Sequence, residues 1–206
     1  MRNFRFREAS DRRVPAKSEH SNNVGSGHLS NFEREFEHAM PIPTSKEELT
    51  KVFTDLGASS PELWAKSQME EGIPQLLRFL FLKNAWHYVV AEGDSSWIEE
   101  QIKLARKWPQ APYAGLGQTL EKLRNQGVAN EDLTTIARCL QAQMIFSLGY
   151  LLDSGPSEQT EEIQDVTWGL FQVDDDGHPL GPAISGLHES VLELDPTQRE
   201  MRPINS

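Results

Sequence analysis

The sequence predicts a mainly α protein, α+β overall: a compact bundle of about six helices followed by a small C-terminal β-hairpin or meander. Two observations lead to this class. Between residues 44 and 152, apolar residues recur with a helical period and are separated by Gly and Pro. After residue 153, the apolar positions alternate instead, on both sides of an Asp-Gly turn signal.

The predicted helices follow from start and stop signals. Ser45 with Glu48 forms a capping box, and Leu49, Val52, Phe53 and Leu56 then recur on one face until Gly57. Pro61 occupies the first turn of a second helix. The remaining helices are expected over 75–91, 97–108, 116–126 and 130–152.

Two of these helices are expected to be central. The segment 75–91 is apolar nearly all round, which is typical of a buried helix. The segment 130–152 has apolar residues on one face and further apolar residues over much of the rest. We therefore predict that Trp86 and Phe146 are core residues of these two helices.

The C-terminal part reads as strands. Residues 166–173 alternate and are rich in β-branched and aromatic side chains, and the turn Asp174–Gly177 follows them. Residues 188–194 alternate as well and form the expected partner or third strand. An isolated hairpin is marginal in water, so we expect it to pack on the bundle.

These patterns divide the chain into three parts. Residues 1–39 are polar and without period, which predicts a disordered N-terminal extension. Because Met40 stands directly before the first helix signals, an alternative is that 1–39 is read in from an early start codon. Residues 40–152 form the bundle, and 153–206 form an acidic linker, the hairpin and a tail packed on the bundle.

The composition limits which cellular compartment and which classes of partner fit the protein. Cys139 is the single cysteine, so no intramolecular disulfide is possible, which suits the cytoplasm. No apolar run is long enough for a signal peptide core or a membrane span, so no membrane contact is expected. The net charge of −11 argues against nucleic-acid binding.

The charge is unevenly spread. Residues 153–206 hold two basic and twelve acidic side chains, for a net charge of −10. From Asp153 to Gln198 there are eleven carboxylates and no Lys or Arg. Such a segment would steer association with a basic protein; the alternative is an acidic surface that serves solubility. The expected partner-binding residues are Asp174, Asp175, Asp176, Glu161, Glu162 and Asp165.

Metal sites are weakly indicated. With Gly177 at the sixth position of a calcium loop, Gln172 falls at the first and Ala183 at the twelfth, where carboxylates are needed. His178 and His188 could meet with Asp176 across a hairpin as a nitrogen and oxygen site. A solvated hairpin tip explains these residues as well, so no metal or cofactor is predicted.

One acid–base candidate exists. His87 lies on the predicted central helix, and Glu70 and Glu71 lie just before that helix. A histidine held by a carboxylate is the usual form of a general base, whereas a buried histidine within a bundle is the simpler interpretation. No serine or cysteine occupies a nucleophile motif. Gly115 and Gly117 precede no phosphate-binding pattern and are better explained by close helix packing.

The sequence therefore indicates two candidate functions. The first is a protein-interaction or regulatory domain that presents an acidic face to a basic partner, as small acidic inhibitors do by analogy. The alternative is a small-molecule enzyme with a pocket between the central helix and the hairpin.

Overall fold

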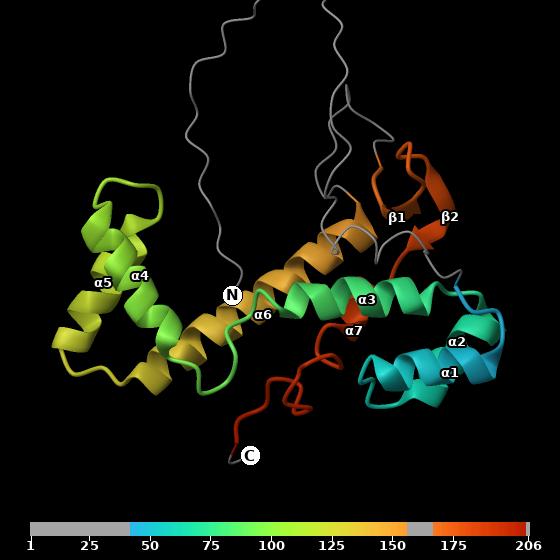
Figure 1. The fold of residues 1–206 in the computed structure, drawn as a ribbon, viewed down its shortest axis with the longest axis horizontal. Helices are drawn as coiled ribbons and strands as arrows, with labels where there is room; N and C mark the ends of the chain where they lie inside the picture. Colours follow the sequence, from blue (N-terminus) through green and yellow to red (C-terminus); the bar gives the residue numbers. More distant parts are fainter. Residues whose placement is uncertain (1–41, 156–166, 205–206) are drawn as a thin grey trace, which may run out of the picture. The chain divides into compact units, whose positions relative to one another are not determined.

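The computed structural model describes residues 42–155 and 167–204, and these residues confirm the predicted fold class. They form helices and one antiparallel hairpin, with no second sheet in the described ranges. In chain order (Figure 1) the elements are α1 Lys46–Asp55, α2 Pro61–Glu71, α3 Gln75–Trp86, α4 Ser96–Lys107, α5 Ala114–Asn125, α6 Asn130–Ser154, β1 Leu170–Val173, β2 Pro179–Ile184 and α7 Leu187–Ser190.

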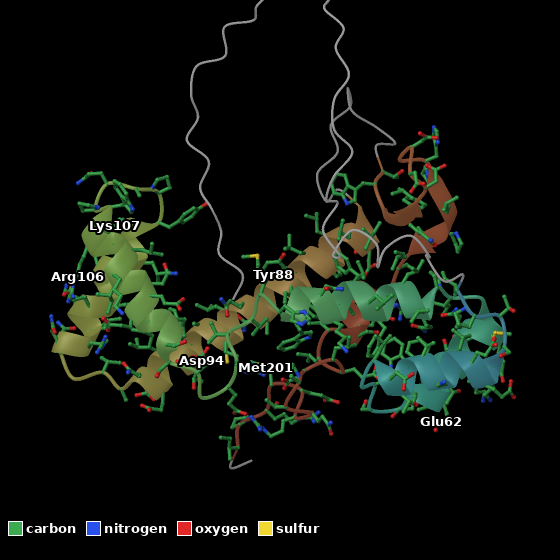
Figure 2. The ribbon with its side chains drawn as sticks, in the orientation of Figure 1. Glu62, Tyr88, Asp94, Arg106, Lys107 and Met201 are labelled. Carbon is green, nitrogen blue, oxygen red and sulfur yellow. The ribbon has the colours of Figure 1, made fainter. Side chains whose placement is uncertain are left out.

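The predicted helix signals act locally as expected. Ser45 caps α1: its Oγ accepts from the amide of Glu48 at 3.2 Å and lies 3.0 Å from the Glu48 carboxylate. Pro61 is the first residue of α2, and Glu62 lies in its first turn (Figure 2). Gly72 ends α2 with a φ of 68°, a conformation that favours glycine.

Apolar side chains gather in three clusters. The first joins α1, α2 and α3, the second joins α4 and α5 to the start of α6, and the third joins α3 and α6 to the hairpin and α7. Helices α3 and α6 each contribute to two clusters and so connect them. The fully buried side chains include Leu49, Phe53, Leu82, Ile98, Ile102, Leu187 and Val191.

The helices α4 and α5 lie side by side (Figure 1) because α5 carries a glycine at their contact. A Cβ atom at Gly117 would stand 2.2 Å from the carbonyl oxygen of Gln101 and 2.6 Å from the Cβ of Ala105. The backbone of α4 fills the space that a side chain would need. The expectation that glycine permits close helix packing is confirmed at Gly117.

Replacing Gly117 with alanine is therefore expected to lower the free energy of unfolding by about 1–3 kcal/mol, the usual cost of overpacking. Gly115 on the same helix is the matched control, because a Cβ there meets nothing within 4 Å. Gly115→Ala should be neutral or stabilise by roughly 0.5–1 kcal/mol through helix propensity. Urea unfolding measures both. Equal stabilities for the two variants would show that α4 and α5 do not make this contact.

Helix α3 is shorter than predicted, because it ends at Trp86 rather than at residue 91. The amides of His87, Tyr88 and Val89 bond three residues back, at 3.0–3.1 Å, which tightens the last turn. Val90 is then held by α6: its amide donates to Gln141 Oε1 at 2.8 Å, and its carbonyl accepts from Arg138 at 3.0 Å. These two bonds replace the helical bonds that Val90 would otherwise make.

The hairpin is confirmed, but its second strand is Pro179–Ile184 and not the predicted segment 188–194. Strand β1 pairs antiparallel with β2, with Leu170 opposite Ile184 and Gln172 opposite Leu180. Residues 188–194 form no strand, since α7 covers Leu187–Ser190 and turns follow it. Leu187 and Val191 stand one helical turn apart, and both are fully buried. The prolines and glycine of PLGPAI concealed β2 in the sequence.

The prediction for α6 is wrong in one respect. Trp86 is confirmed as a core residue at 4% exposure, whereas Phe146 is 42% exposed. From Arg138 onward, helix α6 is buried on one side only, through Arg138, Ala142 and Gly149, whereas Leu133 and Thr134 at its start pack against α4. The apolar residues on its other side face outward.

Two predictions concern residues that the structure does not describe. Residues 1–39 and the linker from 156 to 166 lie outside the described residues, so the expected domain division stays a prediction. Among the helices of the described ranges, none is long and apolar enough to cross a membrane.

Candidate functional site

A buried ion pair fastens the C-terminal segment to α6. Arg138 Nη2 lies 2.5 Å from Asp195 Oδ1, and their side chains are 8% and 0% exposed. Asp195 also accepts from the Thr197 hydroxyl at 2.6 Å and from the amides of Thr197 and Met201 at 3.1 and 2.9 Å; Met201 is labelled in Figure 2. Burial alone would raise the pKa of Asp195, but these bonds and Arg138 outweigh it, so the pKa is lowered.

The segment fastened in this way closes one side of a pocket of about 270 Å³, which we call the aromatic pocket. Its floor holds the buried side chains of Trp64, Phe79 and Trp86. Its other walls are the turn after α1, the last turns of α3 and residues 193–198. The polar side chains at these walls include Lys83, His87 and Glu193.

Glu193 is the most unusual group at this pocket. Burial raises its pKa and the nearby Glu200 adds to the effect, while a hydrogen bond from the Trp64 side chain and the positive charge of Arg78 oppose them. No cation lies within ion-pair distance of Glu193 in the described part of the chain. Lys83 lies at the same pocket, but its ammonium donates to the carbonyl of Leu56.

A second pocket of about 250 Å³ shares Trp64 and Glu193 with the first, and we call it the arginine pocket. Arg78 is buried there, with Nη1 3.3 Å from the Ser190 hydroxyl. Among the described residues, Arg78 Nε and Gln75 Oε1 have no hydrogen-bond partner. Burial lowers the pKa of Arg78, and the charges of Glu189 and Asp153 oppose this.

The Arg78 guanidinium rests against Gly186, which precedes α7. A Cβ there would lie 2.3 Å from Arg78 Nη2, and the φ of 70° also favours glycine. Gly186 therefore lets α7 approach α3 closely enough for Ser190 to reach Arg78.

The two histidines considered as metal ligands, His178 and His188, lie apart, and each contacts a different aspartate. His188 Nδ1 is 2.6 Å from Asp153 Oδ2, and the rings of Phe146 and Tyr150 meet the imidazole edge-on. His178 Nδ1 is 3.3 Å from Asp174 at the hairpin tip. Within the described ranges, no three His, Cys, Asp or Glu side chains gather as metal ligands, so Asp176 does not join them.

The acid–base candidates are not assembled either. His87 is the C-terminal cap of α3 and lines the aromatic pocket. Glu70 lies 3.8 Å from Lys66 on the surface of α2, and Glu71 accepts from Ser67 at 3.0 Å. Neither glutamate lines the aromatic pocket. The carboxylate residues that line this pocket with His87 are Glu193 and Asp195, and Asp195 is already paired with Arg138.

The predicted partner-binding residues fall into two groups. Asp175 and Asp176 are exposed at the hairpin tip. Asp174 organises the turn, because its carboxylate accepts from the amides of His178 and Asp176 at 2.8 and 3.0 Å, and these bonds lower its pKa. Glu161, Glu162 and Asp165 lie outside the described residues.

Sequence reasoning missed Glu193 and Arg78. Arg78 had a usable signal, since a lone arginine inside the apolar run QLLRFLFL has to be buried with it. Glu193 had none, because the alternation over residues 188–194 predicts a strand there.

No protein-family model, curated protein sequence or solved structure matches the chain.

Proposed function

We propose that the protein is a cytoplasmic protein-interaction domain that binds a basic segment of a partner protein through its acidic C-terminal part. The eleven carboxylates and absent Lys and Arg of residues 153–198 support this function. A single, free cysteine suits the reducing cytoplasm. The net charge of −11 favours a basic protein over a nucleic acid.

Fewer carboxylates are available to a basic partner than the number in the sequence suggests. Asp195 is paired with Arg138, and Asp153 and Asp174 each contact a histidine. Four carboxylates of the described C-terminal part make no ion pair with another described residue, and they are Asp175, Asp176, Glu189 and Glu193. Unpaired carboxylates contribute most to long-range attraction of a cation.

The observation that carries the proposal is the position of Glu193. Its charged form is disfavoured by burial and by Glu200, so a cation beside it would recover that loss. The same pocket has an aromatic floor of Trp64, Phe79 and Trp86. A Lys or Arg side chain of the partner would thus meet a carboxylate beside aromatic rings, whose faces attract cations.

The test uses a fluorescent octa-lysine peptide as the probe and the full chain. We expect Glu193→Gln to weaken binding about tenfold, the effect of roughly 1.4 kcal/mol. The matched control is Glu100→Gln on α4, which removes an exposed carboxylate remote from the pocket and should leave the affinity within a factor of two.

The hairpin tip is tested separately. Because Asp175 and Asp176 act at a distance, the double variant Asp175→Asn with Asp176→Asn should slow association and flatten its salt dependence. The melting temperature should stay unchanged. A probe affinity that ignores salt and is equal in Glu193→Gln and Glu100→Gln would overturn the proposal.

A further inference from the structure

Helix α6, whose course Figure 1 shows, carries on its outward side an apolar stripe that no described residue covers. The stripe lies opposite the buried side of the helix, where Arg138, Ala142 and Gly149 face the core. Its members recur every four residues and finally after three. They are Ile136 at 57% exposure, Leu140 at 60%, Met144 at 59%, Leu148 at 51% and Leu151 at 43%.

The stripe is also free of charge. Between residues 136 and 152 the only charged side chain is Arg138, which is buried and paired with Asp195. A basic or acidic partner would find nothing to pair with on this face. The net charge of −11 resides elsewhere, so a second copy would meet no like charge within the stripe itself.

An apolar stripe of this size is expected to be buried against another molecule. Monomeric soluble proteins rarely expose contiguous apolar patches larger than a few hundred Å². Five long side chains, each about half exposed, reach that limit, and Phe146 and Tyr150 extend the patch on one flank at 42% and 55% exposure. A patch of this extent approaches the roughly 800 Å² per partner of a stable interface.

The spacing of the residues allows a second copy of the chain to be the occupant. Around Met144 the stripe is nearly symmetric, with Leu140 and Leu148 four residues away and Ile136 and Leu151 seven or eight away. Two such helices that run antiparallel bring Leu140 against Leu148 and Ile136 against Leu151, with Met144 near the axis.

We propose that the chain forms a two-fold symmetric dimer in which the α6 helices cross antiparallel near Met144. A two-fold interface is isologous, so the same stripe serves both copies. This dimer is independent of the acidic surface, because none of the stripe residues lines the aromatic or arginine pocket.

Sedimentation velocity of the full chain tests the dimer, with an expected mass of twice 23.3 kDa. Leu140→Glu combined with Met144→Glu should give a monomer whose circular dichroism is unchanged, because both side chains are already exposed. The matched control Leu63→Glu changes an exposed leucine of α2, at 66% exposure, and should remain a dimer. A wild-type chain that is monomeric at every concentration would overturn the proposal, whatever else covers the stripe.

Cross-linking tests the arrangement. In a Cys139→Ser background, Met144→Cys should form a disulfide-linked dimer with copper phenanthroline as oxidant, because this position meets itself near the axis. Ile136→Cys alone should not, whereas Ile136→Cys combined with Leu151→Cys should. Efficient cross-linking of Ile136→Cys by itself would indicate parallel helices and would contradict the two-fold antiparallel dimer.

Discussion

Replacing Asp195 with asparagine is expected to destabilise the protein by about 3–5 kcal/mol, because it leaves the Arg138 guanidinium buried without its counter-charge. The two side chains are 0% and 8% exposed, so water cannot take the place of the carboxylate. Asp195 also organises the last described turn through Thr197 and Met201. Urea unfolding of the full chain at pH 7 measures the loss.

The pH dependence of this loss gives a second measurement. The folded pKa of Asp195 lies below that of an unfolded aspartate, about 3.9. Its stabilisation is therefore complete above that value and declines as the pH falls through the folded pKa. The stability gap between wild type and Asp195→Asn should narrow below about pH 4.

Asp175→Asn at the exposed hairpin tip is the control, and it should stay within about 0.5 kcal/mol of the wild type at neutral pH. A gap between wild type and Asp195→Asn that is equally large at pH 3 and pH 7 would show that the carboxylate charge plays no part.

The helices could be predicted from the sequence because their signals are local. Ser45 with Glu48, Pro61 and Gly72 act within one or two turns, and each end lies close to where these residues indicate. The end of α3 could not be predicted, because Gln141 and Arg138 reach Val90 from 48 or more residues away. The same holds for β2, whose prolines are tolerated only because it pairs with one strand.

The candidate site was less predictable, because burial and pairing decide which charges are available. The sequence marks Asp195 and Asp175 equally as acidic, yet one is locked to Arg138 and the other is exposed. Likewise, the sequence alone predicts that the apolar residues around α6 belong to the core. Whether a residue such as Leu140 is covered depends on what packs beside the helix, and periodicity carries no information about that.

Trp86 on α3 and Phe146 on α6 are both aromatic. Truncating them to alanine is expected to lower the free energy of unfolding by very different amounts. Trp86→Ala should cost about 3–5 kcal/mol, because the side chain is 4% exposed and a cavity would remain. Trp86 Nε1 also donates to the Val191 carbonyl at 2.8 Å, and the Arg138 guanidinium lies 5.5 Å from its ring. Phe146→Ala should cost about 1 kcal/mol or less, since this ring is 42% exposed.

A third variant separates packing from hydrogen bonding. Trp86→Phe keeps an aromatic ring in the cluster but leaves the Val191 carbonyl without its donor, which should cost about 1–3 kcal/mol. Chemical denaturation gives the order Trp86→Ala, Trp86→Phe, Phe146→Ala from the least stable variant to the most stable. The comparison is made in the Leu140→Glu, Met144→Glu background, in which a second copy does not cover Phe146. If Phe146→Ala is as destabilising there as Trp86→Ala, the Phe146 ring is buried within the chain, which would contradict its 42% exposure.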